Sequence, residues 1–288
     1  MARTLAASGV VALAVAAVAA APAAARPSAD IAALQVALRA MHLYAGGVDG
    51  VAGPATRAGV RRVQARKGLT VDGIAGPRTR RALGRRGRPR LGSRPLALQT
   101  RGWDVAALQF LLAGHGFPSG PVDGGLGART DAALRRFQAW AGLGADGVAG
   151  AATLAALRRP PPRSPLHFLR PVAAAIGDGF GPRGTFFHPG LDLLASMGDP
   201  VHAGAAGCVE FAGRDNGGYG KLVILRHGLG MTSWYAHLSR IAVRRGACVV
   251  AGALIGAVGS TGASTGPHLH FELRLRGAAV DPSGSIGY

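Results

Sequence analysis

The chain has 288 residues, enough for two or three small domains, and its net charge is +19, from 33 Lys and Arg against 14 Asp and Glu. This excess indicates an acidic partner, either nucleic acid or an anionic cell-wall polymer. No apolar stretch of membrane length follows the amino-terminal one, which argues against a multi-span membrane protein.

Residues 1–25 have the pattern of a secretory signal peptide. Arg3 supplies the positive start, an apolar run extends from Leu5 to about Ala21, and Ala23–Ala25 gives an Ala-x-Ala cleavage site. A transmembrane anchor is the alternative, but the run is short and rich in Ala. We therefore expect a protein that is secreted or held at the bacterial cell wall, with no stable membrane insertion after cleavage. Because an exported protein rarely meets chromosomal DNA, we expect no nucleic-acid partner.

A segment that begins at Asp30 recurs 74 residues later without any change of offset, which indicates a tandem duplication. In each copy, apolar residues at helical spacing alternate with Asp-Gly turns and Gly-x-x-Thr helix starts. The matching pairs are Ala33-Leu34-Gln35 with Ala107-Leu108-Gln109, Val48-Asp49-Gly50 with Val122-Asp123-Gly124, Thr56 with Thr130, Gln64 with Gln138, Asp72-Gly73 with Asp146-Gly147, and Thr79 with Thr153.

These two copies resemble the three-helix, all-α peptidoglycan-binding module found on many wall hydrolases. The resemblance implies a first module at residues 26–84 and a second at 104–157. The Asp-Gly turns are interpreted as structural, so no sugar-contacting residue is assigned.

Two linkers are expected. Residues 85–103 contain six Arg and lie in a stretch without any acidic residue, which favours a solvated basic linker first and an electrostatic anchor to anionic wall polymers second. Residues 158–166 contain Pro160–Pro162 and should be extended and semi-rigid.

Residues 167–288 show short strand-like runs broken by Gly, and no long amphipathic helix follows Leu166. This pattern predicts an all-β, antiparallel catalytic domain. The expected strands are 207–211, 222–226, 232–238, 248–250, 254–258 and 268–275.

The last of these strands carries two histidines on one face. Apolar and polar residues alternate from Leu269, so His268, His270 and Glu272 share the face opposite the core. Upstream, His188 and Asp192 lie in a segment whose Pro and Gly favour a loop that runs into a strand. One His and one Asp from this segment and one His from the late strand make three protein ligands, as in catalytic zinc sites.

At these motifs the chain resembles the lysostaphin-type (LytM-like) zinc metallopeptidases, which cut peptide bonds in bacterial cell walls. The resemblance covers roughly residues 168–282. It implies that His188, Asp192 and His270 bind one zinc ion and that His237 and His268 form the catalytic pair beside it. The motifs are His188-x-x-x-Asp192, Tyr235-Ala236-His237-Leu238-Ser239, Gly259-Ser260-Thr261-Gly262 and Gly266-Pro267-His268-Leu269-His270-Phe271-Glu272.

The chain has only two Glu residues, Glu210 and Glu272, and no His-Glu-x-x-His motif, so histidine must transfer the proton. We assign His268 as general base and His237 to water orientation or oxyanion stabilisation, although the two roles could be exchanged. Glu272 is expected either to orient a histidine ring or to form a solvent-exposed salt bridge.

Cys208 and Cys248 lack a Cys-x-x-Cys partner and are expected to form a disulfide in an oxidising compartment. The sequence thus predicts a secreted, monomeric zinc endopeptidase that hydrolyses stem peptides or cross-bridges of peptidoglycan and is targeted there by two binding modules. The alternative is a catalytically silent wall-binding activator of another hydrolase.

Overall fold

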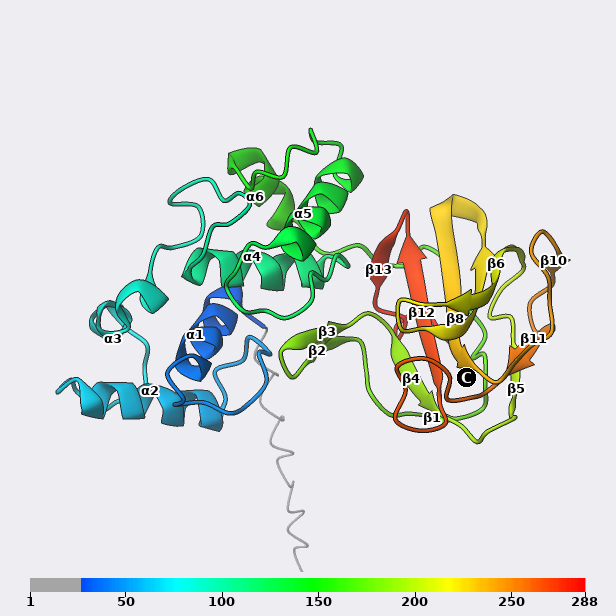
Figure 1. The fold of residues 1–288 in the computed structure, drawn as a ribbon, viewed down its shortest axis with the longest axis horizontal. Helices are drawn as coiled ribbons and strands as arrows, with labels where there is room; N and C mark the ends of the chain where they lie inside the picture. Colours follow the sequence, from blue (N-terminus) through cyan, green and yellow to red (C-terminus); the bar gives the residue numbers. More distant parts are fainter. Residues whose placement is uncertain (1–26, 288) are drawn as a thin grey trace, which may run out of the picture.

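The computed structural model describes residues 27–287, which form two helical modules followed by an antiparallel β-sheet domain (Figure 1). The expected fold class is confirmed. The expected signal peptide, residues 1–25, lies outside the described residues. None of the helices within residues 27–287 is both long and apolar enough to span a membrane.

The two modules have the same helix order. The first contains α1 (Ala29–Arg39), α2 (Pro54–Arg66) and α3 (Pro77–Ala82), followed by the short η1 (Gly84–Gly87), and the second contains α4 (Trp103–Gly114), α5 (Ala128–Trp140) and α6 (Ala151–Leu157). Each helix of the second module begins 74 residues after its counterpart, the same offset as in the sequence. The core around Leu34 and Leu38 of α1 includes Trp103 and Ala106 of α4, so the modules share buried surface.

A buried glutamine holds each Asp-Gly turn to the start of the next helix. Gln35 Nε2 donates to Asp49 Oδ1 at 2.6 Å and to Thr56 Oγ1 at 3.1 Å, while its Oε1 accepts the Gly50 N–H at 2.9 Å. Gly50 has φ +72°, a conformation that favours glycine. The same unit occurs three more times, at Gln64–Asp72–Gly73–Thr79, Gln109–Asp123–Gly124–Thr130 and Gln138–Asp146–Gly147–Thr153.

The segment between the modules is partly folded into the second one. Leu96 is fully buried in the core of that module and pairs with Ala149 by backbone hydrogen bonds. Between α6 and the β domain, the chain from 159 to 163 has no regular secondary structure.

The β domain contains an antiparallel sheet with the strand order β1-β4-β12-β8-β7-β6-β10, and β13 pairs with β12. These strands are β1 (Ala175–Ile176), β4 (Leu191–Leu194), β6 (Gly207–Asp215), β7 (Gly220–Arg226), β8 (Met231–Leu238), β10 (Cys248–Val249), β12 (Leu269–Leu275) and β13 (Ala278–Val280). A second sheet joins β5 (Pro200–His202), β11 (Leu254–Ala257) and β9 (Arg240–Ile241), and the short η2 (Gly228–Gly230) precedes β8.

The core of the β domain lies against one face of the large sheet. Leu269, Phe271 and Leu273 of β12 are fully buried there and pack with Val201 and Ile255 of the second sheet. The alternation expected for this strand is therefore confirmed, and its other face is left for polar residues.

The disulfide between Cys208 and Cys248 is confirmed, because the two residues are paired across β6 and β10 and their sulfurs are bonded. It ties the edge strand β10 to β6. It also closes a loop between residues that are 40 apart in the sequence.

A hairpin of the β domain, β2 (Gly181–Arg183) and β3 (Phe186–His188), extends toward the helical modules, and its turn contacts both of them (Figure 1). The Val48 N–H donates to Gly184 O at 2.6 Å, and the Val122 N–H donates to Thr185 O at 2.8 Å. Val48 and Val122 hold equivalent positions in the two repeats. The two modules thus hold two consecutive carbonyls of one turn.

A second contact joins the other end of the β domain to the second module. The Ala279 N–H donates to Gly116 O at 3.1 Å, and Trp140 Nε1 donates to Leu275 O at 3.2 Å. The guanidinium of Arg276 lies 5.3 Å from the centroid of the Trp140 ring. Modules and β domain therefore contact each other at two separate places.

The glutamine units should control module stability. Gln138→Leu removes the partner of the buried Gly147 N–H and of Asp146 and Thr153, so it should lower the free energy of unfolding by roughly 2–4 kcal/mol. Chemical denaturation measures this loss. Arg136→Leu, at an exposed position of the same helix, is the control and should stay within about 0.5 kcal/mol of the parent. Equal denaturation midpoints for Gln138→Leu and the parent would contradict the structural role.

Candidate functional site

The site begins with two antiparallel neighbours in the large sheet. The register of β12 on β4 places His270 directly opposite Asp192, and β3 ends at His188. His270 Nδ1 lies 2.8 Å from Asp192 Oδ1 and 3.0 Å from His188 Nε2, and His188 Nε2 lies 3.1 Å from Asp192 Oδ1. All three residues are buried, and their polar atoms form a compact triangle.

The outer ring nitrogens of the two histidines have partners that fix their orientation. His188 Nδ1 lies 2.8 Å from Gly179 O, and since a carbonyl only accepts, the proton is on Nδ1 and the lone pair of Nε2 faces the triangle. Carboxylates or carbonyls on the far side of a ring are the usual support of a metal-binding histidine. With two imidazoles and a carboxylate within 4.8 Å of one another, the chain has a group that could hold a divalent metal ion.

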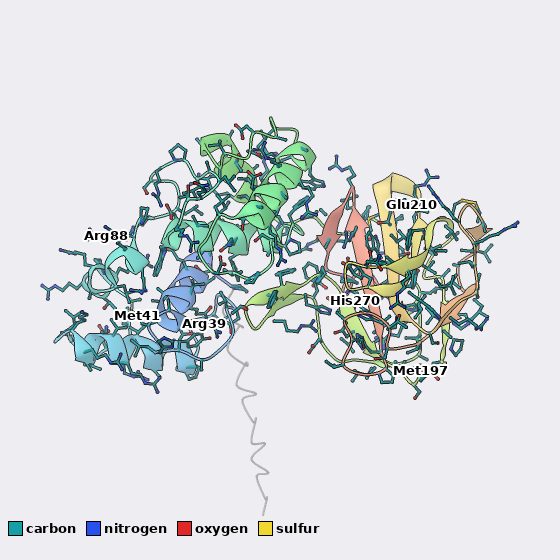
Figure 2. The ribbon with its side chains drawn as sticks, in the orientation of Figure 1. Arg39, Met41, Arg88, Met197, Glu210 and His270 are labelled. Carbon is teal, nitrogen blue, oxygen red and sulfur yellow. A yellow bond between two sulfur atoms is a disulfide. The ribbon has the colours of Figure 1, made fainter. Side chains whose placement is uncertain are left out.

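Glu272 supports His270 from below, in the middle of the β domain (Figure 2). Its Oε1 lies 2.9 Å from His270 Nε2 and accepts from the Tyr219 hydroxyl at 2.7 Å, and its Oε2 accepts from Arg274 Nε at 2.7 Å. The carboxylate is completely buried, so the alternative of a solvent-exposed salt bridge is wrong. Glu272 instead orients the ring of His270.

These contacts shift the protonation of the triangle. Burial lowers the pKa of His270, but the hydrogen bonds with Asp192 and Glu272 outweigh it and raise the pKa to about 9. Burial raises the pKa of Asp192, yet the hydrogen bonds from His188 and His270 hold it well below its usual range. A proton and a metal ion therefore compete for His270 at neutral pH.

The other two predicted histidines lie next to the triangle. The ring centroids of His237 and His268 are 4.8 Å apart, and His268 Nε2 lies 3.6 Å from Asp192 Oδ1. His237 Nδ1 donates to Thr261 O at 2.8 Å and His268 Nδ1 donates to Gly266 O at 2.9 Å, which leaves both Nε2 atoms with a free lone pair. Burial lowers the pKa of His237, so its ring is neutral at pH 7.

All five predicted site residues line one open cavity of about 660 Å³. Its walls come from the β2–β3 hairpin, from the loop before β7 and from the loop before β12. They include Arg183, Phe186, Phe187, Gly217, Gly218, Tyr219, Ala263, Ser264 and Thr265. The triangle forms one part of an extended cleft, as a peptide substrate requires.

Two contributors were not found by sequence reasoning. Arg183 Nη1 donates to Asp192 Oδ2 at 3.1 Å and to Asp178 Oδ2 at 2.8 Å, so it holds the second oxygen of the cluster carboxylate. Nothing in its short Gly-Pro-Arg-Gly context signals this contact. Arg274 neutralises buried Glu272 and stacks 3.7 Å from the centroid of Trp234; its position two residues after Glu272 on an alternating strand was an available signal.

The fold and the site together define a β-sheet domain with a candidate metal centre in a cleft, carried behind two helical modules. The sequence profile of Peptidase family M23 matches residues 186–282, and that of a "Putative peptidoglycan binding domain" matches residues 27–83 and 101–157.

Relatives match through the β domain. The DD-carboxypeptidase/endopeptidase Mpg of Neisseria meningitidis is 50% identical over 95 residues, which are 33% of this chain and 22% of the relative. The match thus spans about a fifth of that protein. The lipoprotein NlpD of Yersinia enterocolitica is 43% identical over 91 residues, 32% of this chain and 93% of the relative. The catalytic domain of lysostaphin from Staphylococcus simulans has 38% identity over 38% of this chain and 90% of its own, with a TM-score of 0.37. The chain belongs to peptidase family M23.

The raised pKa of His270 predicts pH-dependent metal binding. Because the ring keeps its proton up to about pH 9, zinc affinity should fall by roughly tenfold per pH unit as the pH drops from about 9 to about 7. Competition with a chelator measures the affinity. Glu272→Gln removes one of the charges that raise this pKa, so its affinity should begin to fall only at a lower pH. Equal affinities at pH 7 and pH 9 in the parent would contradict the assignment.

Proposed function

We propose that the protein is a secreted, zinc-dependent endopeptidase that hydrolyses peptide bonds of bacterial peptidoglycan. One observation carries the proposal: three buried ligand atoms and two neutral imidazole nitrogens face the same cleft. A ligand triangle alone would suit a structural metal. The added pair of free Nε2 atoms supplies the proton acceptors that hydrolysis needs.

We assign His188, Asp192 and His270 as the ligands of one zinc ion. The donor set of two imidazoles and one carboxylate suits zinc and leaves a further coordination position open. Zinc bound there would lower the pKa of water and polarise the scissile carbonyl. The chain itself fixes the ligands through Gly179 O and Glu272, and Arg183 keeps the carboxylate of Asp192 in place.

We assign His268 as the general base. Its Nε2 is free to accept a proton and is the histidine nitrogen outside the triangle that contacts Asp192 most closely in the described chain. His237 lies on the other side of His268 and faces the same space, so it orients the attacking water or stabilises the developing oxyanion. His237 has φ +60°, a strained backbone conformation for a non-glycine residue, as found at catalytic positions.

The helical modules, proposed at residues 26–84 and 104–157, target the enzyme to peptidoglycan as a monomer. Their match to a peptidoglycan-binding profile supports this partner. The name of the DD-carboxypeptidase/endopeptidase relative supports a wall peptide as substrate. The secreted location follows from the signal-like pattern of residues 1–25.

Three variants separate binding of metal from catalysis. His268→Ala should keep zinc and fold but lose roughly 10²–10⁴ in turnover, the usual contribution of a general base. His188→Ala and His270→Ala should lose zinc and turnover together. Elemental analysis and cleavage of cross-linked wall peptides measure both, and sedimentation with sacculi should be unchanged in all three. If His268→Ala cleaves at the parent rate, the catalytic assignment is wrong; if the parent cleaves no wall peptide, the activator alternative is favoured.

We further propose that anionic wall polymers bind beside the first module. Five arginines line a cavity of about 600 Å³ near η1, and its lining in the described chain contains no acidic residue. They are Arg81, Arg85, Arg88, Arg94 and Arg101. Only Arg94 among them has a carboxylate partner, Asp104 at 2.8 Å. The remaining positive charge is free for a polyanion.

Neutralising two of these arginines should weaken polyanion binding. The double variant Arg85→Gln and Arg88→Gln should bind linear polyphosphate on the order of tenfold more weakly at low salt and show a smaller salt dependence. Arg244→Gln with Arg245→Gln, two exposed arginines of the β domain, is the matched control with the same net charge. Equal weakening in both double variants would show that overall charge, and not this cavity, binds the polymer.

A further inference from the structure

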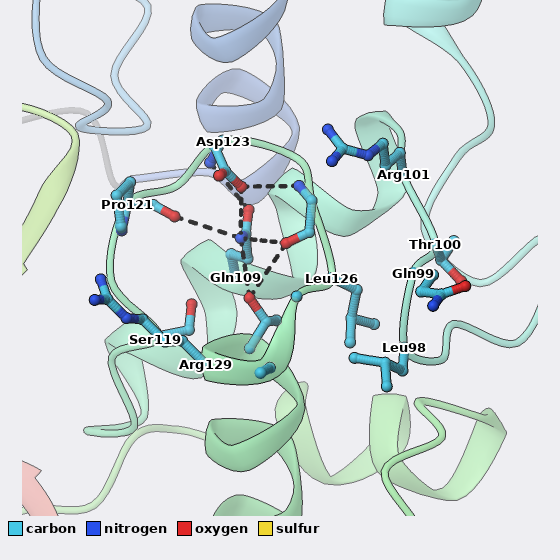
Figure 3. A pocket seen from close by; sticks show the side chains of 14 residues that line it. Leu98, Gln99, Thr100, Arg101, Gln109, Ser119, Pro121, Asp123, Leu126 and Arg129 are labelled. Atoms are coloured by element: carbon cyan, nitrogen blue, oxygen red, sulfur yellow. Dashed lines mark hydrogen bonds between the residues drawn. The ribbon is translucent and has the colours of Figure 1, made fainter.

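The second module contains a cavity of about 600 Å³ that shares no lining residue with the catalytic cleft. It lies between the segment before α4, the Gln109 unit and the start of α5 (Figure 3). The side chains of Gln109, Asp123 and Thr130 at its centre are bonded to one another and serve the fold. The groups around them are therefore the ones free to bind a ligand.

Ser119 is one of these free groups. Its side chain is only 5% exposed, and its Oγ is buried without a hydrogen-bond partner in the described chain. Figure 3 shows this oxygen pointing inward, on the same side of the cavity as Arg129. A buried hydroxyl without a partner costs free energy, so it marks a place where a ligand atom can complete the hydrogen bonding.

The first module differs at the equivalent positions, 74 residues earlier. Ala45 and Ala55 stand where the second module has Ser119 and Arg129. Tyr44 stands where the second module has Pro118. Its hydroxyl donates to Gly47 O at 2.7 Å and accepts from Gln35 Nε2 at 3.3 Å, so a tyrosine covers the glutamine unit there. The two copies share their framework and differ in the residues around it.

The chemistry of the lining specifies the ligand. Arg101 and Arg129 lie on opposite rims, and neither guanidinium is hydrogen-bonded or ion-paired to another described residue (Figure 3). Guanidinium groups bind carboxylates with paired hydrogen bonds. Leu98, Pro121 and Leu126 supply small apolar surface, and none of the described lining residues is aromatic, so a sugar ring would have no face to stack on.

We propose that this cavity binds a short peptide that carries a carboxylate beside small apolar side chains, the chemistry of a peptidoglycan stem peptide. The second module is then the one that recognises wall peptide, with Arg129 and Ser119 as its ligand-contacting residues, and the first module lacks this site. The inference rests on the proposed wall binding of the modules and adds the site and the part of the wall that it recognises.

Isothermal titration calorimetry on the full chain tests this proposal. The probe is an uncross-linked disaccharide–peptide fragment from sacculi, compared with the same fragment amidated at its carboxyl groups and with the peptide-free disaccharide. Arg129→Ala should weaken binding of the first probe by roughly tenfold to a hundredfold, and Ser119→Ala by roughly twofold to tenfold. Both changes introduce the residue of the first module. Arg136→Ala, an exposed arginine on the same helix, is the matched control and should bind like the parent.

Amidation should weaken parent binding by a similar factor, and Arg129→Ala should then cause little further loss because its partner is gone. Parent affinity in Arg129→Ala, or equally tight binding of the peptide-free disaccharide, overturns the inference. A parent that sediments with sacculi but binds no fragment overturns it too while wall targeting stands; a parent that does neither refutes wall targeting itself. Thermal unfolding and peptidase activity should match the parent in all variants, since the cavity is separate from the cleft.

Discussion

The antiparallel pairing of β12 with β4 is the constraint on which the site depends. It sets His270 opposite Asp192, and the alternation of β12 sends Phe271 into the core while Glu272 supports the ring of His270 from the polar face. A slip of one residue would exchange the two faces. Packing of the apolar face therefore fixes the position of the candidate metal ligands, so the geometry of the cluster is inherited from the hydrophobic core.

The sequence was sufficient for the elements with a period. Helices in the modules, the alternating strand β12 and the cysteine pair all followed from local pattern, and the motifs brought five site residues to one cavity. Short strands such as β2 and β3 were not predicted, because three residues carry no period. The contact of Arg183 with Asp192 and the burial of Glu272 depend on segments that meet only in space.

The glutamine units show a repeat that sequence comparison at one offset could not reveal. Each module contains two of them, but Gln35 and Asp49 are 14 residues apart whereas Gln64 and Asp72 are 8 apart. No constant shift aligns the two halves of a module, so only the larger duplication was visible. The structure shows the same solution used four times: a buried amide satisfies one turn donor, one carboxylate and one hydroxyl, which removes the cost of burying them separately.

The turn of the β2–β3 hairpin is held by Val48 and Val122, equivalent residues of the two copies that donate to adjacent carbonyls. Both donors belong to the backbone, so almost any residue except proline could serve at either position. What the contact cannot absorb is a change in chain length, since one inserted residue in either turn would move its N–H away from its carbonyl. We infer that the two copies are free to diverge in side chains, as they have around Ser119, but not in their number of residues between the first helix and this turn.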